Sequence, residues 1–258
     1  LRLIPAKGLI VANGDDGNVR SVLDSVLSKK ITFGFGKKCD VRVDIIETSV
    51  KGTTFEVEGR NFSKESKKHK FTISLFGTHN VLNALGVIIL ARHNGISDKK
   101  IQDAFDSFKS VRRRQELLGE VNGITVYDDF AHHPTAIRET ILAVKQRHPD
   151  KRLIAVFEPR SNTSVLNLQK KNLIESFLAA DEVVLAKLYR KEKIPLDRRL
   201  DVKKVLKSLQ NENIIANEFS NASEIIKYLK TNCIPGDVVL IMSNGKFDDI
   251  HKRLLDEI

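Results

Sequence analysis

The chain has 258 residues, of which 41% are hydrophobic and 29% are charged. These values are typical of a folded globular protein and exclude a disordered chain, and the length allows one large domain or two ordinary ones. The most apolar segments, such as Val81 to Ala91, fall short of the roughly 18 residues that define a candidate membrane-spanning helix. We therefore expect no membrane partner.

The net charge of +10 admits two interpretations, a nucleic-acid binder or a protein with an anionic substrate. The basic residues are spread thinly, and no aromatic residues alternate with them. The densest stretch, Lys64 to Lys70, lies between two strand-like runs and is typical of a solvated loop. We expect no nucleic-acid partner, and a non-catalytic nucleotide or nucleic-acid binding module remains the alternative from another functional class.

The first residue, the single methionine and the cysteines bear on the completeness of the chain and on its cellular compartment. The chain begins with Leu1, and its one methionine is Met242, so the sequence predicts a piece of a longer protein. Cys39 and Cys233 lie far apart without metal-ligand spacing, and no leader for secretion opens the chain. We expect two reduced thiols, a cytoplasmic location and no metal site.

The first part of the chain predicts a mixture of strands and helices. Asn13 to Asp16 follow the first strand and form a turn rich in residues that tolerate positive φ. Three β-type runs then predict an antiparallel meander, and two helices follow, the first ending at Asn94-Gly95 and the second capped by Ser97. The expected elements are a strand at 9–12, a helix at 19–27, strands at 31–34, 41–46, 53–57 and 71–75, and helices at 79–93 and from 98.

From Glu120 onward, short apolar strands alternate with amphipathic helices, a pattern typical of a mostly parallel sheet covered on both faces. We place a domain boundary near the Arg112-Arg113-Arg114 run. The expected elements are strands at 124–127, 152–157, 183–186 and 238–242, and helices at 134–146, 166–180, 201–210, 223–232 and after 246.

Polar residues follow three of these strands, and ligands of such sheets bind at the carboxyl ends of strands. We expect the three loops to meet at one edge of the sheet. Asp128-Asp129 admits a metal pair, a ribose-binding carboxylate or a simple turn. His132-His133 is too small a cluster for zinc. Arg160 offers a bidentate grip on a carboxylate or phosphate, against the alternative of a surface ion pair.

Asn80 and Asn83 share one face of the helix that begins after Gly77, an arrangement suited to reading a purine, although Gly77 and Thr78 also fit a simple capping sequence. The sequence contains no phosphate-binding Gly-x-x-x-x-Gly-Lys-Ser/Thr loop. It also lacks the Gly-x-Ser-x-Gly elbow of serine hydrolases.

Five segments, taken together and in this order over nearly the whole chain, resemble the Mur ligase family. They are residues 77–85 (GTHNVLNAL), 113–116 (RRQE), 127–135 (YDDFAHHPT), 157–163 (FEPRSNT) and 241–245 (IMSNG). The double histidine and the FEPRSNT stretch most resemble the members that recycle murein tripeptide, and the members that add L-alanine are the alternative. One departure is Lys246 to Asp249, where the tripeptide ligases usually have a glycine-rich turn.

The resemblance implies an α/β architecture with residues 1–111 as the C-terminal half of the central ATPase domain and residues 112–258 as a Rossmann-like domain. The UDP-sugar domain, the phosphate loop and the family's metal ligands would then lie upstream. The implied reaction joins UDP-N-acetylmuramate to L-alanyl-γ-D-glutamyl-meso-diaminopimelate through an acyl phosphate, with ATP and Mg²⁺ as cofactors. Without the phosphate loop, these residues alone are expected to be inactive.

The resemblance also implies roles for individual residues. On the nucleotide side, Asn80 and Asn83 would face the adenine, Arg114 the nucleotide at the domain junction, and Asp129 the ribose hydroxyls, while His132 would approach the phosphates. His132 and Arg114 are the expected catalytic residues. The residues expected to bind the carboxylates of the amine substrate are Arg160, Asn162, Ser243, Asn244 and Lys246.

Overall fold

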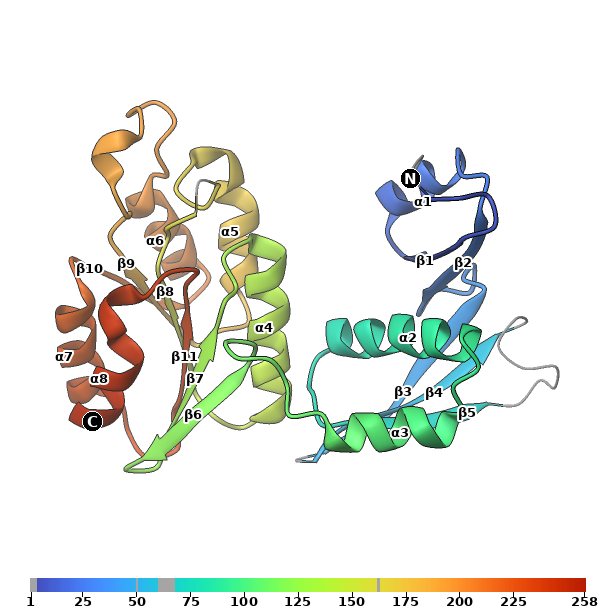
Figure 1. Cartoon of the computed structure of the whole chain (residues 1–258). Helices are drawn as coiled ribbons and strands as arrows, with labels where there is room; N and C mark the ends of the chain where they lie inside the picture. The colour runs from blue at the N-terminus through green and yellow to red at the C-terminus, as the bar shows by residue number, and fades with distance from the viewer. Residues whose placement is uncertain (1–3, 50, 60–67, 162) are drawn as a thin grey trace. The chain divides into compact units, whose positions relative to one another are not determined.

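A computed structural model describes residues 4–49, 51–59, 68–161 and 163–258 of the chain (Figure 1). The chain divides into two compact units, residues 1–109 and residues 110–258. Residues 64–67 of the predicted charged loop lie outside the described residues. None of the helices in the described ranges is long and apolar enough to cross a membrane.

The first unit is a mixed sheet with helices. Its strands lie in the order β1-β2-β3-β4-β5, parallel from β1 to β3 and antiparallel from β3 to β5, which confirms the predicted meander. Its elements are β1 (Leu9–Asn13), α1 (Gly17–Leu23), β2 (Lys29–Gly34), β3 (Val41–Ser49), β4 (Gly52–Gly59), β5 (His69–Ile73), α2 (Thr78–His93) and α3 (Asp98–Ser107).

Two local expectations in this unit need correction, and a third is confirmed. Helix α1 ends at Leu23 and not at Leu27, whose side chain is 93% exposed, so its apolar character does not reflect a buried helix face. The turn after β1 uses no positive φ. Instead, the Asp15 carboxylate accepts hydrogen bonds from the backbone N–H groups of Phe35 (2.7 Å) and Gly36 (2.9 Å). Ser97 occupies the N-cap position of α3, as predicted, and it makes no capping side-chain hydrogen bond.

The core of the first unit lies between the sheet and α2. Phe55 and Phe71 of the sheet and Leu85 and Ile88 of α2 are all essentially inaccessible to solvent. Burying such side chains contributes about 1.5–3 kcal/mol each before conformational entropy is subtracted. Helix α2 ends as predicted, because Gly95 follows Asn94 with φ +78°.

The second unit contains a sheet in the order β10-β9-β8-β11-β7-β6, parallel except for β6, as expected for a Rossmann-like domain. Two of its strands, β6 and β10, were not predicted. Its elements are β6 (Glu116–Val121), β7 (Ile124–Asp129), α4 (Pro134–Arg147), β8 (Leu153–Phe157), α5 (Lys170–Phe177), β9 (Glu182–Ala186), α6 (Val202–Asn211), β10 (Ile215–Phe219), α7 (Ala222–Asn232), β11 (Val238–Met242) and α8 (Ile250–Glu257), with short 3-10 turns at Asn167–Gln169, Lys191–Lys193 and Phe247–Asp249.

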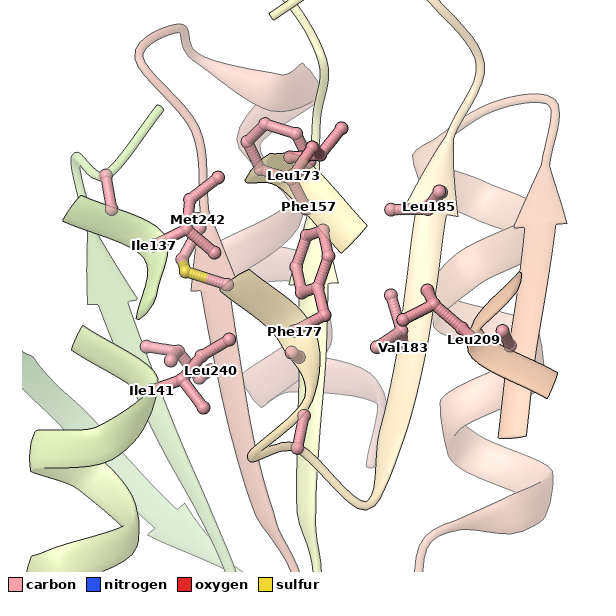
Figure 2. Packing of buried hydrophobic residues seen from close by; sticks show 14 of the residues in the cluster. Ile137, Ile141, Phe157, Leu173, Phe177, Val183, Leu185, Leu209, Leu240 and Met242 are labelled. Carbon is pink, nitrogen blue, oxygen red and sulfur yellow. The ribbon is translucent and has the colours of Figure 1, made fainter. Parts of the chain in front are cut away.

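Helices cover both faces of this sheet. Alternate residues of the central strand β11 point to opposite sides, so Leu240 and Met242 belong to one apolar cluster and Val239 and Ile241 to another. Helices α4, α5 and α6 pack on the first side, where Phe177 of α5 is fully buried, and α7 and α8 pack on the second (Figures 1 and 2). The expected doubly covered parallel sheet is therefore confirmed.

Both cysteines are free thiols, as expected. Burial raises the pKa of Cys233 to about 12, and the nearby Asp237 carboxylate acts in the same direction. A thiol with so little thiolate at neutral pH is a weak nucleophile.

Candidate active site

Three neighbouring strands end at the same level of the second sheet. Strand β11 lies between β8 and β7, and its last residue, Met242, is in register with Phe157 on one side and Asp129 on the other. The loops after these strands therefore leave the sheet side by side, which confirms their predicted convergence. Parallel strands with helices on both faces place ligand sites at this edge.

Asp129 is a buried carboxylate at the end of β7, with 2% exposure. Its two oxygens accept hydrogen bonds from the backbone N–H groups of Gln115 (2.8 Å) and Ala131 (2.7 Å). Burial raises the pKa of the Asp129 carboxyl, while these two N–H groups and the charge of Arg114 oppose that rise. A carboxylate oxygen has room for a second hydrogen bond, so Asp129 retains the capacity to accept hydroxyl groups of a ligand.

The adjacent Asp128 lies against side chains from other parts of the chain, and the sequence did not predict these neighbours. Arg113 donates from Nε to Asp128 Oδ2 (3.1 Å) and from Nη2 to the backbone oxygen of Ser243 (2.6 Å). On the other side, His251 Nε2 of α8 lies 3.0 Å from Asp128 Oδ1, but the two groups are not oriented to form a hydrogen bond. Arg113, in the segment before β6, thus joins the ends of β7 and β11 through Asp128 and the Ser243 carbonyl.

Arg114 and His132 both lie against Phe130. The Arg114 side chain is exposed, and its Cζ atom lies 5.8 Å from the centre of the Phe130 ring. The His132 ring meets the Phe130 ring edge to face at 5.3 Å, and its Nδ1 lies 2.9 Å from the Phe130 carbonyl oxygen. Because that oxygen can only accept, Nδ1 carries the proton in this contact, and Nε2 is left to act as an acceptor when the ring is neutral. His133 is exposed at the N-terminus of α4.

Glu158 and Ser243 link the ends of β8 and β11. Ser243 is fully buried, and its hydroxyl donates to Glu158 Oε2 (2.5 Å) while accepting from the backbone N–H of Gly245 (2.9 Å). The other oxygen of Glu158 accepts from Arg160 Nη1 (3.4 Å). Ser243 therefore shapes the loop and orients Glu158, which in turn holds Arg160.

Arg160 is held on two sides. Its Cζ atom lies 3.8 Å from the centre of the Tyr189 ring, within the range of a cation–π interaction. On another side is the backbone of Gly245, where an added Cβ would come within 2.5 Å of Arg160 Cδ and 2.6 Å of Nε. The side chain is still 29% exposed. The guanidinium is thus oriented by its neighbours and open to an anion.

The other residues predicted for the amine side differ in their surroundings. Asn244 Oδ1 is buried with no hydrogen-bond partner among the described residues, and Lys246 is exposed. Asn162 lies outside the described residues.

The departure from a glycine-rich turn after Gly245 has a physical explanation. Phe247, Asp248 and Asp249 have φ values of 49°, 50° and 52°, in the left-handed region that glycine adopts most easily. Phe247 is 3% exposed and packs in the cluster beneath α7 and α8, so burial of its ring offsets the backbone strain. Residues 247–249 thereby adopt left-handed backbone conformations without glycine.

Asn80 and Asn83 belong to the first unit, in the first turns of α2. Asn80 Nδ2 donates to the carbonyl oxygen of Phe76 (2.8 Å), and Asn83 is exposed. Gly77 precedes the helix with φ +90°, a conformation that favours glycine. Throughout the ranges that the structure describes, no group of three or more His, Cys, Asp or Glu side chains is arranged to hold a metal ion.

Comparison with known families supports this architecture in both units. The Mur ligase glutamate ligase domain matches residues 113–245, and the Mur ligase middle domain matches residues 1–91. The chain belongs to the Mur ligase family. Both predicted parts of the fold are thus confirmed: a portion of the middle domain, followed by the C-terminal domain.

Two curated relatives of this chain have different substrates in their names. The chain is 30% identical over 258 residues to a UDP-N-acetylmuramate–L-alanine ligase of Caldanaerobacter subterraneus, covering 99% of the chain and 54% of the relative. It is 41% identical over 184 residues to the UDP-N-acetylmuramate–L-alanyl-γ-D-glutamyl-meso-2,6-diaminoheptandioate ligase of Escherichia coli, covering 71% of the chain and 38% of the relative.

A solved structure agrees with these matches. The crystal structure of a murein peptide ligase from Psychrobacter arcticus has a TM-score of 0.69 and 34% identity, over 99% of this chain and 52% of the other. The chain spans about half the length of the relatives that align along its whole length.

Proposed function

We propose that this chain forms part of an ATP-dependent ligase that joins UDP-N-acetylmuramate to the murein tripeptide L-alanyl-γ-D-glutamyl-meso-diaminopimelate, as in peptidoglycan recycling. The observation that carries the proposal is Arg160, a guanidinium oriented by Glu158, Tyr189 and Gly245 and still open to solvent. A guanidinium fixed in this way suits a carboxylate-rich amine substrate. The 41% identity to the tripeptide ligase of E. coli supports the same choice.

On the nucleotide side, the resemblance to the Mur ligases gives a role to individual residues of each unit. We assign Asp129 to the ribose hydroxyls, because each of its oxygens accepts one backbone hydrogen bond and can accept another. Asn80 and Asn83 would read the adenine, and Arg114 and His132 would neutralise and orient the phosphates. ATP with Mg²⁺ would supply the phosphoryl group that activates the muramyl carboxylate.

On the amine side, we assign Arg160 to a carboxylate of the peptide. Ser243 positions Glu158, and Asn244, whose buried Oδ1 lacks a partner among the described residues, would accept a hydrogen bond from the substrate. Asn162 and Lys246 would border the same site. In this division of labour, residues 1–111 contribute to the nucleotide site and residues 112–258 carry the amine site, and catalysis rests on positioning and electrostatics.

The second candidate is a ligase that adds L-alanine to UDP-N-acetylmuramate. It is supported by the alignment of such a ligase over 99% of the chain. The test is phosphate release by the full-length gene product with ATP, Mg²⁺ and UDP-N-acetylmuramate, with tripeptide compared against L-alanine. Turnover with tripeptide alone supports the proposal, turnover with L-alanine alone selects the second candidate, and silence with both overturns both in favour of a non-catalytic nucleotide-binding module.

We also infer that residues 1–258 alone do not catalyse ligation, because no phosphate-binding loop of the Gly-x-x-x-x-Gly-Lys-Ser/Thr type occurs in them. The purified chain should release no phosphate from ATP in a substrate-dependent manner. Substrate-dependent phosphate release that persists through a second purification and is lost in an Asp129→Asn variant would contradict this inference.

A further inference from the structure

A second guanidinium shares the aromatic ring that orients Arg160. The Cζ atom of Arg190 lies 5.1 Å from the centre of the Tyr189 ring, compared with 3.8 Å for Arg160. Both arginines therefore lie within the range of a cation–π interaction with one side chain. Arg190 was not among the residues predicted from the sequence, because it follows a strand that carries no motif.

The local backbone ties this second arginine to the first. The backbone N–H of Tyr189 donates to the carbonyl oxygen of Pro159 (3.2 Å), which joins the loop after β9 to the loop after β8. Arg190 itself has φ +50°, in the left-handed region, and its carbonyl oxygen accepts from the N–H of Lys193 (2.9 Å). A non-glycine residue held in this conformation is strained, and such strain is concentrated at functional sites.

The charges around the ring are not balanced. Arg160 pairs with Glu158, but that carboxylate also accepts a hydrogen bond from Ser243. Within the described ranges, Arg190 forms no ion pair, and its side chain is exposed. Two guanidinium groups near one ring repel each other, and an anion that contacts both removes the repulsion while gaining charge-assisted hydrogen bonds.

We propose that Tyr189 and Arg190 belong to the amine-substrate site, and that Arg190 binds a second carboxylate of an acidic peptide whose first carboxylate is bound by Arg160. This inference rests on the proposed function and adds to it a residue that selects the substrate. L-Alanine has one carboxylate, whereas the tripeptide has carboxylates on both its glutamyl and diaminopimelyl residues. Arg190 therefore favours the peptide over the single amino acid, and Tyr189 acts as a positioning residue for both arginines.

The test compares Arg190→Gln with Arg198→Gln in the full-length gene product. Arg198 is an exposed arginine of the same segment whose backbone oxygen accepts from Asn167 N–H (2.8 Å), and no contact of its side chain is seen among the described residues. Both variants lose one positive charge, so the global electrostatic change is the same. Steady-state kinetics are measured with the tripeptide and with analogues in which one carboxylate at a time is replaced by a carboxamide.

We expect Arg190→Gln to reduce kcat/KM for the tripeptide by about 10-fold or more, mainly through KM, and Arg198→Gln to leave it unchanged. For one carboxamide analogue, the loss caused by Arg190→Gln should disappear, because the carboxylate that Arg190 binds is already gone. Tyr189→Leu should raise KM, with an unchanged Tm showing that the fold is intact.

Equal kcat/KM for Arg190→Gln and Arg198→Gln would overturn the inference while leaving the proposed function in place. So would a loss of the same size for the tripeptide and for every carboxamide analogue. A wild-type enzyme that does not use the tripeptide would overturn the proposed function and this inference together.

Discussion

Replacing Gly245 by alanine tests whether the orientation of Arg160 matters for the amine substrate. The new Cβ would lie 2.5 Å from Arg160 Cδ, 2.6 Å from Nε and 2.7 Å from Cζ, whereas ordinary contacts begin at 3.4 Å. The guanidinium must therefore move by about 0.7–0.9 Å, and a misplacement of about 1 Å in a positioning group costs up to roughly 100-fold in rate. Gly245 does not have positive φ, so alanine introduces no backbone strain.

The expected result for Gly245→Ala is a loss of about 10- to 100-fold in kcat/KM for the tripeptide, or roughly 1.4–2.8 kcal/mol of transition-state stabilisation. The KM for ATP should change little. Stability should fall by no more than the roughly 0.5–1 kcal/mol of an exposed cation–π contact, because the displaced group is the far end of a flexible side chain. The assay is steady-state phosphate release by the full-length gene product, accompanied by thermal unfolding.

Gly119→Ala is the matched control in the same unit, since its Cβ would meet only Leu255 Cδ2 at an ordinary distance of 3.6 Å. It should retain wild-type kinetics. Wild-type kcat/KM for the tripeptide in Gly245→Ala would refute the reasoning. A large drop in Tm with parallel losses for all substrates would also refute it, because the glycine would then be required for folding and not for the orientation of Arg160.

Three further predictions concern Asp129, Phe177 and His148. Asp129→Asn should raise the KM for ATP on the order of 10-fold, measured by phosphate release, because the amide cannot accept from both Gln115 N–H and Ala131 N–H while also holding the ribose. Phe177→Ala should lower the unfolding free energy by about 3–5 kcal/mol in urea denaturation, because the ring is fully buried among α4, α5 and the sheet. His148→Gln should reduce the pH dependence of stability below pH 6.5. Burial, followed by the charges of Arg147 and Lys151, lowers the pKa of His148 from its usual 6.5. The unfolded state therefore binds a proton that the folded state excludes, and the wild-type protein loses stability as the pH falls.

Each of these predictions has an outcome that contradicts it. An unchanged KM for ATP in Asp129→Asn would remove Asp129 from the nucleotide site. A loss below about 1 kcal/mol in Phe177→Ala would mean that the core collapses to fill the cavity. If wild type and His148→Gln lose stability in parallel between pH 7 and pH 5, then burial and the charges of Arg147 and Lys151 do not keep the His148 ring neutral in the folded state.

The regular elements were predictable where their own residues carry the pattern. Strands β7, β8 and β11 are continuous apolar runs because both of their faces are covered, and they were placed to within about two residues. Strands β6 and β10 were missed because they lie at the two edges of the sheet, where partial exposure weakens the pattern. Helix α5 begins at Lys170, later than the predicted 166, after a 3-10 turn at Asn167–Gln169.

For the candidate site, the sequence by itself determined which strands end in polar loops and predicted that these loops meet, because the polar residues that follow apolar strands are a local signal. The neighbours of those residues came only from the tertiary structure. Arg160 meets Tyr189 and Gly245, and Asp128 meets Arg113 and His251, across separations that no local pattern reports. Arg160 meets Gly245 because β11, the last strand in the chain, inserts between β8 and β7, and Arg160 meets Tyr189 because β9 is the other neighbour of β8. Strand order is a property of the whole packed sheet, so it decides the partners of each side chain after the local elements are set.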